Sequence, residues 1–331
     1  MNNFKKIGMT ALAASLVSTS VFAGELAVTG SASINSEGHS GVALNAGTTF
    51  SMGNQLTFTG SGELDNGMNV AVSFVIDEFD GANVASVANA GSVFDAHSVT
   101  VSSDALGSLK FSGEGGSSAS TAIDTTAAGD IWDNFDGITS VGTSPALGVT
   151  NSDPGTNSFY YTLPSMVDGL AVNASYKPQG STAVSAIGYG VGYTGVEGLS
   201  VHYAVTDIET AAVNTSGDQT VMKATYAYGP VTVGYSVTDM DLGATDLTGD
   251  QETTSMAVSY TVSDAISVTY GTEEINLGSS ATDAEYSIIK GSYTSGGMTI
   301  SASMADGDNT AFGTGAGEDL EYWGLGLSFA F

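Results

Sequence analysis

The chain has 331 residues, a formal net charge of −29, 44 glycines and no cysteine. The lack of cysteine excludes a disulfide-stapled secreted module and a thiolate metal site, and the strong negative charge excludes nucleic acid as a partner by repulsion. A Gly-rich chain with only 12% charged residues could be a disordered surface protein, but 14 tyrosines, placed at alternating positions, argue for folded strands.

The first residues have the pattern of a secretion signal. Lys5 and Lys6 form a charged start, a modestly apolar stretch follows, and Ala23 fits the small-residue cleavage rule. We therefore predict a signal peptide over 1–23 and one mature domain over 24–331, with four lysines and no arginine against 35 acidic residues. No later run approaches eighteen apolar residues, so the sequence predicts no transmembrane helix.

Alternation of apolar with small or polar residues runs through the mature chain, in pairs of runs joined by tight turns. Asp65-Asn66-Gly67 joins one such pair, and Asn-Gly between alternating runs is a strong hairpin signal. The last run ends on the terminal Phe331, with Leu325, Leu327 and Phe329 on the same face. One first strand, seven hairpins and one closing strand make sixteen predicted strands: 26–34, 56–64 with 70–76, 99–101 with 109–111, 159–163 with 170–176, 187–193 with 199–205, 222–226 with 231–237, 256–262 with 266–270, 289–293 with 298–304, and 325–331.

Long polar connections alternate with the short turns. Closing the last strand onto the first removes the exposed sheet edges, so this layout predicts an all-β fold, a transmembrane antiparallel β-barrel with short periplasmic turns and long external loops. The third connection is the longest, and because a loop of about forty residues needs a function, we predict that it folds into the lumen. The connections are 35–54, 77–96, 113–157, 178–185, 206–219, 239–253, 274–284 and 305–318.

With a signal peptide, eight hairpin-like units (the seven hairpins and the pair formed by the first and closing strands), a long third loop and a terminal Phe331, the chain resembles Gram-negative general porins over 24–331. It is most similar in layout to the sixteen-stranded trimeric porins of alphaproteobacteria. The resemblance implies an outer-membrane channel for passive diffusion of ions and small hydrophilic solutes, in contact with outer-membrane lipid and lipopolysaccharide. It also implies that Phe331 is part of the signal read by the barrel-assembly machinery.

The resemblance further implies a homotrimer, and small outward residues indicate where the copies meet. The first two strands present Gly30, Ala32, Gly60 and Gly62 outward, whereas later strands present Tyr, Ile, Val and Met. Small residues let backbones approach closely at protein contacts within a membrane. We therefore expect the contact at the first strands and the closing strand; a barrel that packs only against lipid is the alternative.

Because side chains alternate between the two faces of a strand, the position of a charged residue relative to its apolar neighbours predicts whether it faces lipid or the lumen. We call this alternation parity. All four mature lysines, Lys177 among them, fall on the lumen face, although avoidance of lipid alone explains that placement. In the resembled porins the third loop narrows the channel and faces wall arginines, which this chain lacks. We therefore predict a constriction that favours cations, unless the loop is an ordinary solvated one. Its residues are Asp124, Asp130, Asp133 and Asp136 of the loop and Lys110, Lys223 and Lys290 of the wall, with Trp132 and Phe135 pinning the loop to the barrel.

One external loop is crowded with carboxylates, at Asp239, Asp241, Asp246, Asp250 and Glu252. Divalent cations such as Ca²⁺ take six to eight oxygen ligands and could bind here loosely. The spacing matches no EF-hand, so a solvated acidic loop is the alternative. We expect no other cofactor.

Three other functions fit the composition less well. An enzyme would need a catalytic constellation, and His39, His97 and His202 are the only histidines. A structural or adhesive surface barrel would not need a long loop folded inward. A substrate-specific channel, for sugars or another solute, would line its wall with aromatics, but inward aromatics are few: Tyr160, Tyr286 and Tyr322.

Overall fold

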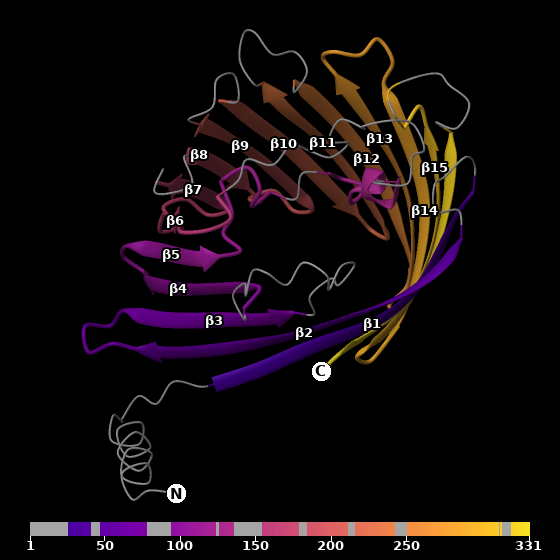
Figure 1. The fold of residues 1–331 in the computed structure, drawn as a ribbon. Helices are drawn as coiled ribbons and strands as arrows, with labels where there is room; N and C mark the ends of the chain where they lie inside the picture. The colour runs from indigo at the N-terminus through magenta and orange to yellow at the C-terminus, as the bar shows by residue number, and fades with distance from the viewer. Residues whose placement is uncertain are drawn as a thin grey trace, which may run out of the picture.

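The fold is known from a computed structural model, which describes residues 26–40, 47–77, 94–123, 126–135, 154–178, 184–210, 216–241, 250–310, 312 and 319–331. Sixteen strands form one closed antiparallel barrel (Figure 1). The strands are β1 (Leu26–Ser40), β2 (Thr48–Glu63), β3 (Asn69–Asp77), β4 (Ala96–Ser103), β5 (Gly107–Glu114), β6 (Ser158–Thr162), β7 (Leu170–Lys177), β8 (Val184–Tyr193), β9 (Leu199–Thr210), β10 (Gly217–Tyr228), β11 (Val231–Asp241), β12 (Gln251–Ser263), β13 (Ile266–Leu277), β14 (Ala284–Ser295), β15 (Met298–Asp308) and β16 (Leu320–Ala330); a short 3₁₀ helix, η2 (Ile131–Phe135), lies in the loop after β5.

Each strand pairs with its neighbours in the sequence, and β1 pairs with β16 to close the sheet. The closure reaches the last residue: Gly30 and Phe331 exchange backbone hydrogen bonds, with N–O distances of 2.7 and 3.0 Å. Closure leaves no unpaired edge, which is the condition for a sheet to exist in lipid. The sixteen predicted strands and the predicted barrel are therefore confirmed.

The two faces of the sheet alternate as the sequence pattern predicts. In β8, Ile187, Tyr189 and Val191 are exposed on the outside, whereas the intervening glycines Gly188 and Gly190 are buried on the inside. Apolar outward residues can face lipid, and small inward residues leave room inside the barrel. Short turns such as the one at Gly198, with a φ of 76°, use the left-handed conformation that glycine adopts without strain.

Several strands are longer than predicted, at the end where the long connections lie. The first strand continues to Ser40 instead of 34, and the connection expected over 274–284 is only 278–283. At these ends the outward positions change from apolar to acidic or polar, as at Asp207 in β9 and Glu274 in β13. The period-two hydrophobic signal therefore disappears although the backbone pairing continues.

The predicted signal peptide, 1–23, lies outside the described residues. Across the part of the chain that the structure covers, we find no helix with the length and hydropathy that crossing a membrane requires.

Candidate functional site

The long loop after β5, here called loop 3 (described over 115–123 and 126–135), lies along the inner wall of the barrel (Figure 1). Inward hydroxyl groups of several strands bind it: the N–H of Ala119 donates to Ser175 Oγ of β7 at 2.9 Å, and the Oγ of Ser120 lies 2.8 Å from Thr206 Oγ1 of β9. Further along, the N–H of Ala127 donates to Ser236 Oγ of β11 at 2.9 Å. The prediction that this loop folds into the lumen is confirmed.

Glycines of the wall let loop 3 approach closely. A Cβ atom at Gly271 of β13 would lie 2.6 Å from the Cβ of Ala128, and one at Gly234 of β11 would lie 3.2 Å from the Cβ of Ala127. Ala128 also donates its N–H to Ser255 Oγ of β12 at 2.9 Å. Small residues on both surfaces therefore set the position of the loop against the wall, as they do at close helix contacts.

Another attachment of loop 3 is a buried carboxyl group. Glu273 of β13 is 2% exposed, and its Oε2 accepts the N–H of Ile131 at 2.7 Å and that of Trp132 at 3.2 Å. Ser255 Oγ donates to the other carboxylate oxygen at 3.3 Å. A carboxylate that accepts several hydrogen bonds is among the stronger polar contacts in proteins, so Glu273 fixes the start of η2.

The end of loop 3 packs into an aromatic cluster. Phe135 is 0% exposed, and its ring lies 5.5 Å from that of Tyr286 and 6.4 Å from that of Tyr322. His39 Nε2 of β1 lies 2.8 Å from the carbonyl oxygen of Asn134. Trp132 is partly buried against the same cluster, which also includes Ile131. Both aromatic residues of the loop thus contact the wall, as predicted from their presence in an acidic segment.

Two of the predicted wall lysines bind the backbone of loop 3. Lys223 Nζ of β10 donates to the carbonyl of Thr126 at 2.9 Å, and Lys290 Nζ of β14 donates to those of Ala128 at 3.0 Å and Gly129 at 3.3 Å. Lys110 lies on β5, in the part of the wall before β7, where the hydrogen bonds of the loop begin. The three lysines therefore do not form one cluster opposite the loop.

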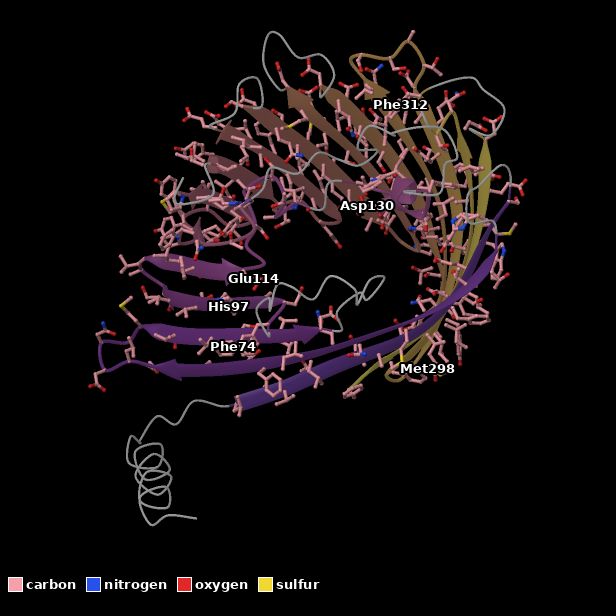
Figure 2. The ribbon with its side chains drawn as sticks, viewed as in Figure 1. Phe74, His97, Glu114, Asp130, Met298 and Phe312 are labelled. Carbon is pink, nitrogen blue, oxygen red and sulfur yellow. The ribbon has the colours of Figure 1, made fainter. Side chains whose placement is uncertain are left out.

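Two of the four predicted loop aspartates lie among the described residues. Asp130 and Asp133 are both exposed, and Figure 2 shows Asp130 on the inner side of the barrel. Asp124 and Asp136 lie outside the described residues. The membership of the seven residues in a constriction stays a prediction.

Sequence reasoning missed Glu273, His39 and the wall serines as attachments of the loop. Parity places Glu273 inside the barrel, but its partners lie 142 and 141 positions away in the sequence. The only indication in the sequence was that Glu273 is a single inward carboxylate among Ser, Thr and Gly residues.

The predicted external cation candidates lie at strand ends instead of within one loop. Asp239 and Asp241 belong to β11, Asp250 precedes β12, and the three line a hollow of about 410 Å³ together with Glu252. Asp246 lies outside the described residues. Among the side chains that the structure describes, no group of three or more His, Cys, Asp or Glu is arranged to hold a metal ion.

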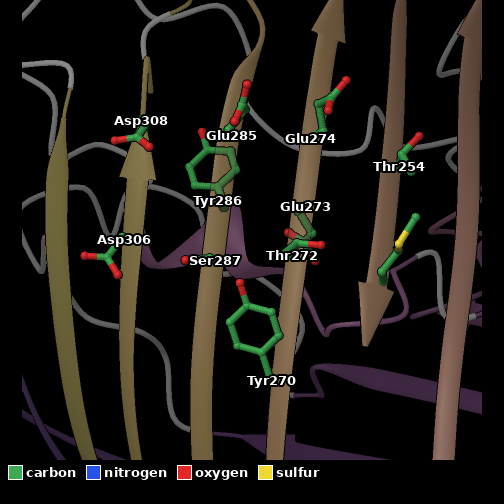
Figure 3. A pocket seen from close by; sticks show the side chains of 11 residues that line it. Thr254, Tyr270, Thr272, Glu273, Glu274, Glu285, Tyr286, Ser287, Asp306 and Asp308 are labelled. Atoms are coloured by element: carbon green, nitrogen blue, oxygen red, sulfur yellow. The ribbon is translucent and has the colours of Figure 1, made fainter. Parts of the chain in front are cut away.

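Three of these carboxylates, Asp239, Asp241 and Glu252, are part of a larger surface that we call the outer acidic belt. Its members share the outward parity of the apolar residues in their strands and often face one another directly, as Glu285 faces both Glu274 and Asp308. Figure 3 shows these three with Asp306 around a hollow of about 310 Å³. The belt consists of Asp207, Asp218, Asp239, Asp241, Glu252, Glu274, Glu285, Asp306, Asp308 and Glu321.

The outer ends of the first strands differ from the belt. On β2, Phe50 is 78% exposed and Met52 is 62% exposed, and Phe74 of β3 is also exposed. In the outer acidic belt, carboxylates lie directly opposite one another, and like charges in that arrangement destabilise a sheet. The belt therefore needs counter-ions from its surroundings. The apolar sector of β2 and β3 needs an apolar neighbour instead. The outer rim is thus divided into two chemically different sectors.

Comparisons with known proteins agree with this architecture. The sequence matches the family model described as Gram-negative porin over residues 8–290. Similar solved structures include an anion-selective porin from Comamonas acidovorans (TM-score 0.65, 16% identity, covering 93% of this chain and 100% of that chain). Another is OmpT from Vibrio cholerae in a trimer form (TM-score 0.66, 15% identity, covering 93% and 100%). A Rh. blastica porin mutant gives a TM-score of 0.61 at 16% identity with the same coverage. A comparison with curated protein sequences found no match.

Proposed function

The chain belongs to the Gram-negative porin family, and from this premise we propose that it forms a water-filled outer-membrane channel through which ions and small hydrophilic solutes diffuse passively, with a preference for cations. The observation that carries the proposal is loop 3, which lies along the inner wall of a closed barrel and exposes carboxylates. A loop in this position narrows the lumen. Export through a signal peptide cleaved after Ala23 completes the proposal.

Charge supports the preference for cations. Asp130 and Asp133 are exposed, and the sequence has 35 acidic residues against six basic ones. Excess carboxylates in a narrow channel concentrate cations and repel anions. The anion-selective Comamonas porin is only 16% identical, so its likeness concerns the fold and leaves selectivity to be measured.

The aromatic residues support a general channel over a sugar-specific one. Tyr286 is buried beneath Phe135, and Tyr322 is a partly buried neighbour of the same cluster. Their rings therefore hold the loop and do not form a row along the solute path. Uptake of neutral sugars into proteoliposomes should fall steadily with solute size and show no saturation.

Reversal potentials in a salt gradient test the ion preference. We expect a cation-directed reversal potential for the native protein in planar bilayers, and a much smaller one when Asp124, Asp130, Asp133 and Asp136 are all replaced by asparagine. Two charges about 4 Å apart interact by about 1 kcal/mol in water and about fourfold more at an effective dielectric constant of 20. The preference should fade as the Debye length falls from about 30 Å at 0.01 M to about 3 Å at 1 M salt. An unchanged reversal potential would remove these aspartates from the constriction.

We also propose a homotrimer whose contact includes β1, β2 and β16. Gly60 of β2 has space around it, since the nearest atom to an added Cβ is 3.9 Å away, and the exposed Phe50 and Met52 require an apolar neighbour. Gly60→Trp should shift the protein from trimer to monomer because the indole would separate the two backbones. Native mass measurement in detergent reads this out, and Gly291→Trp on β14 is the matched control. A native protein found only as a monomer contradicts the proposal.

Except for Glu321 on β16, the outer acidic belt lies on strands outside the proposed trimer contact, and its carboxylates support lipopolysaccharide as the molecule that contacts this part of the barrel. We propose that divalent cations, bound loosely at sites such as Asp239, Asp241 and Asp250, bridge these carboxylates to lipid phosphates. Magnesium should then raise the melting temperature in vesicles that contain lipopolysaccharide more than in phosphatidylcholine vesicles. Equal effects in both would contradict the bridge and leave the channel function intact.

A further inference from the structure

Asp130 lies between two polar groups, a lysine and a buried carboxyl group, that neighbouring strands supply. On its amino-terminal side, Lys290 Nζ of β14 donates to the carbonyls of Ala128 at 3.0 Å and Gly129 at 3.3 Å. On its carboxy-terminal side, Glu273 Oε2 of β13 accepts the N–H groups of Ile131 and Trp132 at 2.7 and 3.2 Å. The ammonium group of Lys290 thus donates to carbonyl oxygens, and the carboxyl group of Glu273 accepts from N–H groups.

The backbone at this point has a conformation that needs support. Asp130 has a φ of 48° and follows Gly129, whose φ is 82°. A left-handed residue other than glycine costs on the order of 1 kcal/mol and persists where the surroundings hold it. Thr126 adds to that support, since its Oγ1 accepts the Asp130 N–H and donates to Asp130 Oδ1, both at 2.8 Å.

The result is a carboxylate turned away from the wall. Ile131 is buried against the wall, while its neighbour Asp130 is exposed on the inner side of the barrel (Figure 2). We propose that Glu273 and Lys290 are positioning residues that hold Asp130 at the ion path, and that Asp130 determines the ion preference of the channel. This inference rests on the proposed channel function and deepens it.

The Lys290→Met variant distinguishes the positioning of Asp130 by Lys290 from the direct effect of the Lys290 charge on permeating ions. If Lys290 acted only through its charge, its removal would make the lumen more negative and strengthen the preference for cations. If it holds Asp130 in place, its removal releases the loop and weakens that preference. We expect the potassium-to-chloride permeability ratio to fall by roughly two- to fivefold, the effect of about one carboxylate on a monovalent ion.

Three controls accompany this variant. Lys110→Met, on a part of the wall away from the bonds of the loop, should raise the ratio because it removes charge alone. Lys290→Arg keeps the charge and the donors and should restore the native ratio. Asp130→Asn should lower the ratio in the native background but have little further effect in the Lys290→Met background, because residues that act as one unit are not additive.

The outcomes are distinct. A ratio that rises in Lys290→Met, with single-channel conductance retained, overturns the positioning role and leaves the channel function standing. Absence of any conductance from the native protein overturns the channel function itself. If Lys290→Met fails to insert, Glu273→Gln combined with Asp130→Asn gives the same additivity test, and full additivity there also overturns the proposal.

Discussion

Deletion of Phe331 is expected to lower the amount of folded protein in the outer membrane by roughly 5- to 30-fold. The deletion removes the two backbone hydrogen bonds that Phe331 exchanges with Gly30 across the closing seam. It also removes a ring that occupies the space above Gly30, where an added Cβ would lie 2.6 Å from the ring. A net contribution of about 1 kcal/mol for each hydrogen bond accounts for a factor of this size.

Membrane fractionation and a heat-modifiability assay measure this effect. Molecules that do insert should conduct normally, because Phe331 is 72% exposed and its ring packs over Gly30 at the closing seam. Phe331→Tyr keeps the ring and both backbone bonds and is the matched control. Native levels of the deletion variant would contradict a role for the terminal aromatic in assembly.

Gly271→Leu is expected to reduce single-channel conductance by pushing loop 3 toward the centre of the lumen. Even the Cβ of the new side chain would lie 2.6 Å from the Cβ of Ala128 and 3.4 Å from its Cα, so the loop backbone itself must move. The movement strains the bond from the Ala128 N–H to Ser255 and the adjacent bonds to Glu273. Overpacking of this kind costs about 1–3 kcal/mol.

The matched control for this variant is Gly291→Leu on the adjacent strand β14, where nothing lies within 4 Å of an added Cβ. Planar-bilayer recording should show native conductance for the control and lower conductance for Gly271→Leu. Thermal unfolding should show a lower melting temperature only for Gly271→Leu. Equal conductance of the two variants would mean that the wall glycines do not set the position of the loop.

The candidate site was only partly predictable from the sequence. Parity correctly placed Lys223 and Lys290 inside the barrel, because a charge facing lipid is costly. Parity could not show that the two lysines bind carbonyl oxygens of loop 3, since those partners are 97 and 162 positions away. The prediction that these lysines line a constriction therefore assumed where their side chains lie relative to loop 3, and only the folded barrel determines that.

What the sequence by itself determined is the sheet: sixteen strands, their inward and outward faces, and the short turns between them. These follow from local chemistry, because strand periodicity and the demands of lipid act on each residue separately. The tertiary structure decided the full length of the strands at the outer acidic belt, where backbone pairing continues without an apolar pattern. It also decided the path of loop 3, because that path depends on hydroxyls, glycines and charges that seven strands, β7 and β9 to β14, bring together only when the barrel closes.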